Sequence, residues 1–396
     1  MGFRTLDGVE VRGKRALVRV DFNVPMHDGA VADDSRLKAA LPTIARLRSG
    51  GAKVILLSHF DRPKGRRVDR MSLAPVADPL SKLIGAPVAF ADDSIGQAAR
   101  TAVEAMADGD VLLLENVRFH PGEEANDADY ATALAANGDL YVDDAFSAAH
   151  RAHASTQAIA GRLPAYAGEA MRRELDALEK VLGAPLRPVL GIVGGSKVST
   201  KLDLLRNLIT RLDALAIGGG MANTFLFAQG WEVGGSYCEK DLAHEAKGVV
   251  EFATRRGCEL LLPVDIVVAE RAAPGEAVRT RGLGEIDDSE RILDAGPATI
   301  DRLNRAMDVS RTLIWNGPLG VFETPPFDRG TTRAARHAAE RVKAGKLIAV
   351  AGGGDTVAAL NQAGVTQDFT FVSNAGGAFL EWMEGKVLPG VAALQS

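Results

Sequence analysis

The sequence has few of the residues that would place it in several large classes of protein. It contains only 2 cysteines in 396 residues, Cys238 and Cys258, which are too few for a disulfide framework and lack the spacing of a metal site. No apolar stretch approaches the roughly 20 residues that a membrane-spanning helix requires. We therefore expect a protein of the cytoplasm, a reducing compartment, with no membrane partner.

A large excess of charge of either sign is also missing. The formal net charge is −5, which argues against a nucleic-acid partner. The chain is 46% hydrophobic and 24% charged, and it contains no low-complexity tract and no repeat of solenoid length. This composition predicts a globular protein of two or three domains.

The sequence does show a regular alternation of short β-rich runs with amphipathic stretches of helical length. This alternation is typical of βα units that build a parallel sheet covered by helices. The β-rich runs of the first half begin at Arg15, Ala52, Ala86, Val111 and Leu140. Those of the second half begin at Arg187, Asp213, Glu259, Arg311, Lys346 and Asp368.

The helical stretches suggest how the two halves are joined. A helix is expected from Ser35, because apolar residues recur at helical spacing up to a Gly-Gly stop. A charged amphipathic stretch from Gly168 to Gly183 is expected to be one connector helix. The predicted fold is therefore α/β, with two doubly wound Rossmann-like domains that have parallel sheets and are joined by a connector helix and hinge.

Glycine follows most of the predicted strands of the second half. Ligands of open parallel sheets bind outside the carboxyl ends of the strands, where glycine lets the backbone approach a phosphate. Five of the six runs end in this way, which favours a nucleotide or phosphate site over simple turns. Two common phosphate motifs are excluded: Ser196 precedes Lys197, unlike a Walker A loop, and "IGGGMANTF" from Ile217 does not fit G-x-G-x-x-G.

Polar residues beside these glycines could bind a nucleotide. Lys197 and Lys201 are four residues apart beside the start of a helix expected from Ser199, so they suit a polyphosphate, or they are two solvated lysines on an exposed face. Asp355, followed by Thr356, could cap a helix or ligate Mg²⁺.

Two more polar residues follow the strand expected from Arg311. Asn316 stands at the end of that strand, and Glu323 could accept hydrogen bonds from ribose hydroxyls. Each would be an ordinary loop residue if it stood alone.

The first half places a different set of polar residues at or near the ends of its predicted strands. Arginine binds phosphate and carboxylate bidentately, so several converging arginines indicate a small anionic substrate. The alternative is a scatter of surface arginines in salt bridges. The residues of this set are Asp21, Asn23, Arg36, His59, Arg62, Arg118 and Arg151.

An anion site in one domain and a nucleotide-like site in the other suggest a hinged kinase, because phosphoryl transfer depends mainly on positioning, cations and the exclusion of water. At this point ten segments, in order, resemble the phosphoglycerate kinase family. They extend from near residue 15 to residue 391 and read "RVDFNVP", "SHFDRPKG", "ENVRF", "VDDAFSAAHRAHAS", "VGGSKVSTK", "IGGGMANTF", "LPVDIVVA", "WNGPLGVFE", "AGGGDT" and "EGKVLPGV".

The resemblance implies a reaction and a set of domains. The reaction is reversible transfer of the acyl phosphate of 1,3-bisphosphoglycerate to Mg-ADP, giving 3-phosphoglycerate and Mg-ATP in glycolysis and the Calvin cycle. The domains are a glycerate-substrate domain at 1–168 plus about 387–396, the connector at 169–185 and a nucleotide-binding domain at 186–386. A monomer that works by hinge closure is also implied.

The resemblance also implies the role of each residue. The seven polar residues of the first half would bind the glycerate substrate. Arg36 would also stabilise charge on the transferring phosphoryl group, together with Lys197 and the backbone N–H groups of Gly353, Gly376 and Gly377. The nucleotide would be bound by Lys197, Lys201, Gly218, Gly219, Leu293, Asn316, Glu323, Gly352, Gly353, Asp355 and Thr356. In that set Asp355 would ligate Mg²⁺, Glu323 would take the ribose, and Gly218 and Gly219 would face the base. No general base is required, because the attacking oxygen is already ionised.

Several positions depart from the family pattern. Phe60 and Asp61 stand where Leu and Gly are usual, and Asp tolerates the left-handed backbone of such a turn. Ile292 and Ala295 are unusual near the expected adenine pocket. Ser196 replaces a common Ala, and the residues Asn374, Ala375 and Phe379 change the last glycine-rich block, where Phe379 adds bulk at a helix start.

None of these departures removes a charged group with an implied catalytic role, so we expect an active enzyme. Two alternatives remain beside this reading. One is a catalytically impaired family member that binds nucleotide or anions as a partner protein. The other, based on the first half alone, is a sugar-phosphate enzyme of another class, against which the nucleotide segments argue.

Overall fold

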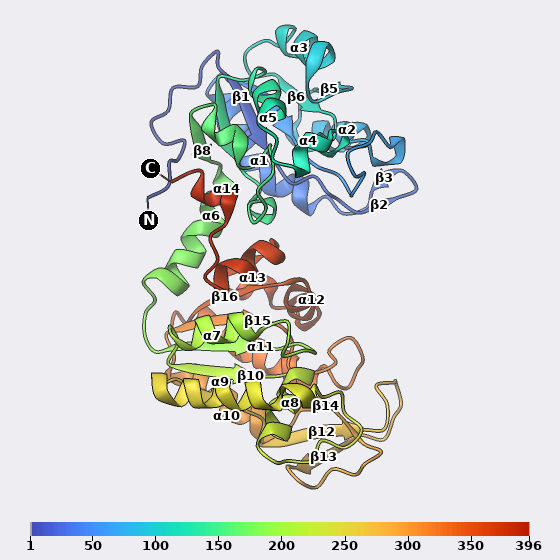
Figure 1. Cartoon of the computed structure of the whole chain (residues 1–396), viewed down its shortest axis with the longest axis vertical. Helices are drawn as coiled ribbons and strands as arrows, with labels where there is room; N and C mark the ends of the chain where they lie inside the picture. The colour runs from blue at the N-terminus through green and yellow to red at the C-terminus, as the bar shows by residue number, and fades with distance from the viewer. Residues whose placement is uncertain (1, 396) are drawn as a thin grey trace. The chain divides into compact units, whose positions relative to one another are not determined.

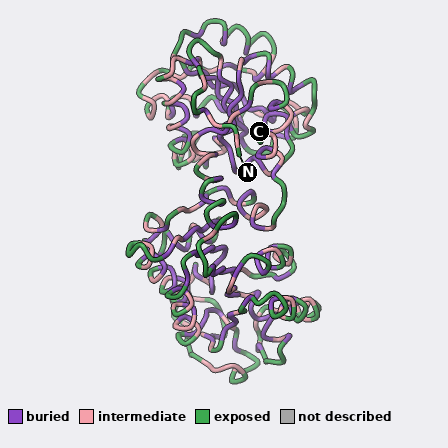
Figure 2. Tube along the Cα trace, turned by 90° about the vertical axis from the view of Figure 1, so that its left-hand side faces the viewer, coloured by how far each residue is buried: buried purple, intermediate pink, exposed green. Residues whose placement is uncertain are grey.

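The computed structural model describes residues 2–395 and divides the chain into two compact units (Figure 1). The first unit runs to Leu175 and includes the tail from Val387, and the second spans Asp176–Lys386. Buried segments run through the interior of each unit, and exposed segments lie mainly at its periphery (Figure 2). Within the described residues, none of the helices has the length and apolar character needed to cross a membrane.

The first unit is built on a six-stranded parallel sheet in the order β5-β6-β4-β1-β7-β8. Its central strands are buried along their length, as expected for a sheet with helices on both faces. The strands are β1 (Arg15–Arg19), β4 (Lys53–Leu57), β5 (Val88–Ala91), β6 (Val111–Leu114), β7 (Leu140–Asp143) and β8 (Ala165–Ala167). The first five confirm the five expected runs. The three-residue strand β8 was not expected, because it is too short to carry a pattern.

Helices of the first unit pack their apolar stripes on this sheet. Helix α1 confirms the helix expected from Ser35, and it buries Leu37, Ile44 and Leu47 in the core. The helices are α1 (Ser35–Ser49), α2 (Ala74–Ile84), α3 (Gly96–Glu104), α4 (Pro121–Glu124), α5 (Ala128–Ala135) and α14 (Pro389–Ala392). A short hairpin joins β2 (Met26–His27) to β3 (Ala30–Val31).

The second unit contains a six-stranded parallel sheet in the order β11-β10-β9-β15-β16-β17. By chain position within the sheet this is 3-2-1-4-5-6, the order of a doubly wound fold, and it reverses between β9 and β15. The strands are β9 (Val189–Val193), β10 (Ala214–Ile217), β11 (Glu259–Leu261), β15 (Thr312–Asn316), β16 (Ile348–Gly352) and β17 (Phe371–Ser373). The expected doubly wound α/β class is confirmed in this unit by its sheet order.

Helices cover this second sheet, and one helix spans the boundary between the units. Those of the second unit are α7 (Leu202–Ile209), α8 (Gly220–Ala228), α9 (Ala243–Arg256), α10 (Pro297–Val309), α11 (Arg329–Lys343), α12 (Gly354–Ala363) and α13 (Gly377–Met383). Helix α6 (Glu169–Leu178) continues as one π-helical stretch at Glu179–Gly183. The amphipathic segment from Gly168 is therefore helical up to Gly183.

The single strand expected from Glu259 was wrong. The segment forms two strands that are separated at Pro263. Strand β11 joins the parallel sheet, whereas β12 (Asp265–Ala269) does not. Proline lacks an N–H and cannot continue a sheet interior. Strand β12 instead pairs antiparallel with β13 (Arg279–Gly282) and β14 (Arg291–Ala295), so the second unit has a small third sheet.

Phe379 provides a test of core packing in the second unit. Its ring is fully buried under the end of β16, where a Cβ on Gly352 would lie 2.5 Å from its Cδ1 atom. We expect Phe379→Ala to lower the free energy of unfolding by about 3–5 kcal/mol, because it leaves a cavity. Chemical denaturation measures this loss. The control Val309→Ala, at a residue 69% exposed, should change it by less than about 0.5 kcal/mol, and a similar change in both variants would contradict the packing argument.

Candidate active site

In the first unit the strand order reverses around β1, which lies between β4 and β7. Loops that leave β1 and β4 therefore begin side by side at the carboxyl edge of the sheet. Asp21 and Asn23 follow β1, and His59 follows β4. The topology thus brings these three predicted residues to one edge.

Asp21 links two other elements to this edge. Its Oδ2 atom accepts a hydrogen bond from Nη1 of Arg36 in α1 at 2.7 Å and one from Oγ of Ser147 at 2.5 Å. Burial raises the pKa of the Asp21 carboxyl, but the neighbouring His59, Arg36 and the Ser147 hydroxyl together hold that pKa below its ordinary value. A charged Asp21 therefore orients Arg36, whose side chain is still 38% exposed.

The loop after β4 is tied to its neighbours through its backbone. The backbone N–H of Asp61 donates to Oδ1 of Asn23 at 2.9 Å, and its carbonyl accepts from Nη1 of Arg118 at 2.8 Å. Asp61 has φ 52°, so the expected left-handed turn is confirmed with Asp in place of glycine. Its carboxylate lies on the exposed side of the turn.

The cations of this edge differ in their surroundings. Arg118 is buried, which lowers the pKa of its guanidinium, and its Nε lies 3.5 Å from Oε1 of Glu124. Arg62 is exposed. Arg151 is also exposed, and its Nε donates to Nε2 of His150 at 3.2 Å. The structure therefore places Asp21, Asn23, Arg36 and Arg118 in hydrogen-bonded groups and leaves Arg62 and Arg151 at the surface.

In the second unit the central strands β9, β15 and β16 are joined at their carboxyl ends. Nζ of Lys201 donates to the carbonyl of Gly194 at 2.6 Å and to Oδ1 of Asn316 at 2.7 Å. The Asn316 amide in turn donates to the carbonyl of Gly352 at 2.8 Å, which also accepts from Oγ1 of Thr356 at 2.9 Å. These bonds position Lys201 at the point where the strand order reverses.

The expected helical spacing of Lys197 and Lys201 was wrong. Helix α7 begins at Leu202, and Ser199 lies in a turn before it. Glu239 supports this turn by accepting hydrogen bonds from N and Oγ of Ser199, at 3.1 and 2.6 Å. Lys197 is therefore exposed on a loop, whereas Lys201 is half-buried.

Burial gives Lys201 an unusual protonation equilibrium. It lowers the pKa of the amine to about 8, although the nearby carboxylate of Asp355 opposes this effect. Since the amine keeps a pKa near neutral pH, a bound anion would favour its charged form. Lys201 is thus suited to respond to a phosphate ligand.

Helices α8 and α12 begin directly after glycines at the ends of their strands. Their N-cap residues, Gly219 and Gly353, have φ 67° and 100° and provide no side-chain cap. A Cβ at Gly353 would lie 2.7 Å from Nδ2 of Asn316, so only glycine fits. Helix α13 begins in the same way, at Gly377 after Gly376. Uncapped N–H groups at helix starts are suited to bind phosphate oxygens.

Two narrow cavities of about 20 Å³ each lie beside β10 and β14. Gly218 lines one, Gly219, Ile292 and Leu293 line the other, and Ala295 lines both. The residues expected near a base thus lie together, including the two unusual ones. Glu323 lies exposed in the loop after β15.

Phe379, the residue expected to add bulk at the start of a helix, is the third residue of α13. Its ring packs into the core behind Gly352 and is fully buried. The glycines that start the helix, Gly376 and Gly377, are therefore not covered by this side chain.

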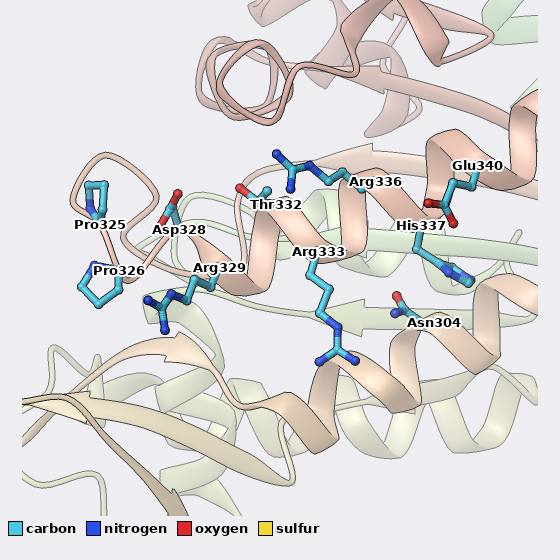
Figure 3. Close-up of a pocket in the computed structure, with 10 residues that line it drawn as sticks. All are labelled: Asn304, Pro325, Pro326, Asp328, Arg329, Thr332, Arg333, Arg336, His337 and Glu340. Atoms are coloured by element: carbon cyan, nitrogen blue, oxygen red, sulfur yellow. The ribbon is translucent and has the colours of Figure 1, made fainter.

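A larger groove of about 730 Å³ lies elsewhere, along α10 and α11 (Figure 3). Two of its basic side chains contact carboxylates: Arg333 pairs with Asp301 at 2.7 Å, and His337 contacts Asp308 at 3.0 Å. None of the expected site residues lines it. Size alone does not identify a site in this molecule.

Sequence reasoning missed Ser147 and Glu239, which hydrogen-bond Asp21 and Ser199, and Arg19, whose side chain is fully buried at the end of β1. Arg19 gave one signal, an arginine inside a run of otherwise apolar β residues. Ser147 and Glu239 gave none, because they act from loops distant in sequence from their partners.

The chain has two doubly wound units, with arginines at the carboxyl edge of the first sheet and lysine and glycines at the carboxyl edge of the second. These features define a two-domain α/β phosphotransferase, and comparison with solved structures agrees. The structure is similar to that of phosphoglycerate kinase from Coxiella burnetii, with TM-score 0.93, 39% identity and 99% of each chain covered. It is also similar to phosphoglycerate kinase from Pyrococcus horikoshii OT3, with TM-score 0.79, 29% identity, and 99% and 98% of the two chains covered.

The chain belongs to the phosphoglycerate kinase family. The family model "Phosphoglycerate kinase" matches residues 6–386. The sequence is 68% identical over 396 residues to phosphoglycerate kinase of Caulobacter vibrioides, with 100% of both chains covered. It is 60% identical to that of Rhodopseudomonas palustris, with 99% of this chain and 98% of the relative covered. The resemblance found in the sequence is confirmed.

The surroundings of Lys201 predict its titration. In the folded chain its amine should titrate near pH 8, below the ordinary 10.5. Between these values the native state binds fewer protons than the unfolded state, so this group increases the free energy of unfolding as pH rises through that window. NMR of ¹³Cε-labelled lysine, with Lys201→Met for assignment, measures the pKa. A Lys201 signal that titrates near 10.5 would contradict the effect of burial.

Proposed function

We propose that the chain divides the phosphoglycerate kinase reaction between its units, with the glycerate substrate on the first and the nucleotide on the second. The reaction is reversible transfer of the acyl phosphate of 1,3-bisphosphoglycerate to ADP, giving 3-phosphoglycerate and ATP, a step of glycolysis. The full-length family match carries this proposal. The two sheet edges support the division, because each gathers the residues suited to one substrate.

The first unit would bind a small glycerate with two anionic groups, a phosphate and a carboxylate. Guanidinium groups would hold its phosphate and carboxylate bidentately, and Asp21 and Asn23 would accept and donate at its hydroxyl. Asp21 is kept charged and Arg36 is kept oriented before substrate arrives. The residues assigned to this substrate are Asp21, Asn23, Arg36, His59, Arg62, Arg118 and Arg151.

The second unit would bind ADP or ATP along its carboxyl edge. Lys201, Asn316 and the uncapped start of α12 would face the phosphates, because Asn316 links Lys201 to Gly352 at the carboxyl end of β16. Gly218, Gly219 and Leu293 would contact the base beside the narrow cavities, and Glu323 would take the ribose. The remaining assigned residues are Lys197, Gly352, Gly353, Asp355 and Thr356.

Transfer itself would depend on electrostatic stabilisation. Arg36, Lys197 and the N–H groups of Gly353, Gly376 and Gly377 would stabilise charge on the phosphoryl group as it moves. The attacking carboxylate or phosphate oxygen is already ionised, so no side chain has to remove a proton. Since one phosphoryl group must meet cations of both units, we propose a hinge-bending step during turnover.

The donor set suits Mg²⁺ held mainly by nucleotide phosphates. Among residues 2–395, no group of three or more His, Cys, Asp and Glu side chains could form a protein cage for a metal. Asp355 offers one exposed carboxylate in the first turn of α12, which fits the one or two protein ligands that Mg²⁺ usually takes. When bound, the ion would neutralise phosphate charge. We further propose that the chain acts as a monomer in the cytoplasm, with small-molecule partners only.

The catalytically impaired alternative receives no support. The departures at Asp61 and Phe379 leave the turn formed and the ring buried in the core. The high identity over the full chain favours an active enzyme.

Replacement of Arg36 or Lys197, the two cations expected to contact the transferred phosphoryl group, tests the mechanism. Arg36→Ala and Lys197→Ala should each lower kcat by at least about a hundredfold, because each removes a charge that stabilises the transition state. Circular dichroism should show an intact fold. The control is Lys346→Ala, an exposed lysine at the amino end of β16, and it should keep full turnover. Near-normal kcat in either site variant would reject that residue's role.

Asp355 has a separate test. Asp355→Asn should raise the Mg²⁺ concentration for half-maximal turnover by about tenfold, because the amide keeps the shape but loses the charge that attracts the ion. Initial rates over a range of free Mg²⁺ at fixed ATP measure this shift. An unchanged Mg²⁺ dependence would mean that Asp355 does not ligate the ion and serves only as an acidic residue in the first turn of α12.

A further inference from the structure

Arg19 is a fully buried arginine at the end of β1, and it has no part in the roles assigned so far. A guanidinium in the interior is costly unless its donors are satisfied. All three nitrogens have partners: Nε donates to Oγ of Ser155 at 2.8 Å, Nη1 donates to the carbonyl of Val20 at 2.5 Å, and Nη2 lies 3.1 Å from Nδ1 of His59. Arg19 is therefore fixed in one orientation.

The hydrogen bonds behind Arg19 have a defined direction. A guanidinium only donates, so the Ser155 oxygen must accept from it and give its own proton elsewhere. That proton goes to Oε1 of Glu123 at 2.6 Å, and the Ser155 backbone N–H donates to Oε2 at 2.9 Å. Glu123 is fully buried. Glu123 is therefore the final acceptor in a series of hydrogen bonds that runs from Arg19 through the Ser155 hydroxyl.

The same logic applies to His59 on the other side. Because Nη2 of Arg19 can only donate, Nδ1 of His59 must carry its lone pair, and the ring proton must be on Nε2. A second proton would place a cation against Arg19, with Arg118 and Arg36 adding repulsion and only Asp21 opposing it. Burial first, and then Arg19, lower the pKa of His59 well below its ordinary value. The ring is therefore neutral at pH 7.

We propose that Arg19 is a positioning residue that fixes His59 in the neutral Nε2–H form, so that His59 offers one hydrogen-bond donor to an acceptor oxygen of the glycerate substrate. This inference rests on the substrate-binding role proposed for His59. Ser155 and Glu123 support this role of Arg19 because they hold its guanidinium in the orientation described above. A neutral donor selects for an oxygen that accepts a hydrogen bond, whereas a charged imidazolium would attract any anion.

The direct test is the protonation state of His59 in the intact wild-type chain. Long-range ¹H–¹⁵N NMR of ¹⁵N-histidine distinguishes the two tautomers, and His59→Gln assigns the signal among the 7 histidines. We expect a bare Nδ1 and a protonated Nε2 at pH 7 without substrate. A protonated Nδ1, or a doubly protonated ring, overturns the proposal. This measurement needs no turnover, so its result is independent of the proposed function.

A variant pair tests the consequence for binding. Arg19→Lys keeps the charge but cannot make three planar bonds, so His59 should show mixed tautomers and the affinity for 3-phosphoglycerate should fall about tenfold, with ADP affinity unchanged. The control is Arg15→Lys on the same strand, where the guanidinium pairs with Asp139 at 2.7 Å, and neither quantity should change.

An unchanged His59 tautomer together with unchanged 3-phosphoglycerate affinity in folded Arg19→Lys overturns the proposal. If Arg19→Lys does not fold, the wild-type spectrum decides the question. Normal 3-phosphoglycerate affinity in His59→Gln, with the expected tautomer in the wild type, would instead reject the proposed role of His59.

Discussion

Parallel strands of a sheet all end at the same edge, and every candidate functional residue of this chain depends on that constraint. The strand order reverses around β1 in the first sheet and around β9 in the second. At such a point the loops that follow adjacent strands lead to opposite faces of the sheet, and the crevice between these loops can be lined by polar residues. Asp21 and Lys201 lie at these two points, and each joins elements that are far apart in sequence. The topology of the two sheets thus positions the candidate functional residues before any ligand binds.

Hydrogen bonds keep the cations of these edges oriented at a modest cost. Lys201 is held by two neutral oxygens, which accept two of its three N–H donors without cancelling its charge. Arg36 is held by a carboxylate, but its side chain keeps a substantial exposed fraction. Arg19 is buried completely and acts through His59. Groups that are oriented in advance need little reorganisation when charge develops on a phosphoryl group, which is the main source of electrostatic catalysis.

Much of this could be predicted from the sequence, and the failures have physical causes. Buried parallel strands read as continuous apolar runs, so most strands and the doubly wound class were predictable, and the resemblance supplied the residue roles. The run from Glu259 was misread because periodicity does not distinguish one strand from two that separate at Pro263. Lys197 and Lys201 were misplaced because the turn before α7 depends on Glu239, about forty residues away. The orientation of Phe379 depends on the space left by Gly352, which no local pattern reveals.

The central claim is that the two sheet edges bind different substrates through different cations. Calorimetric titration of the intact chain with 3-phosphoglycerate and with Mg-ADP tests it most directly, using Arg118→Ala and Lys201→Met. The account predicts that Arg118→Ala weakens only 3-phosphoglycerate binding and Lys201→Met weakens only Mg-ADP binding, each by at least about tenfold. Weakening of the opposite substrate, or unchanged affinity for both, would contradict it.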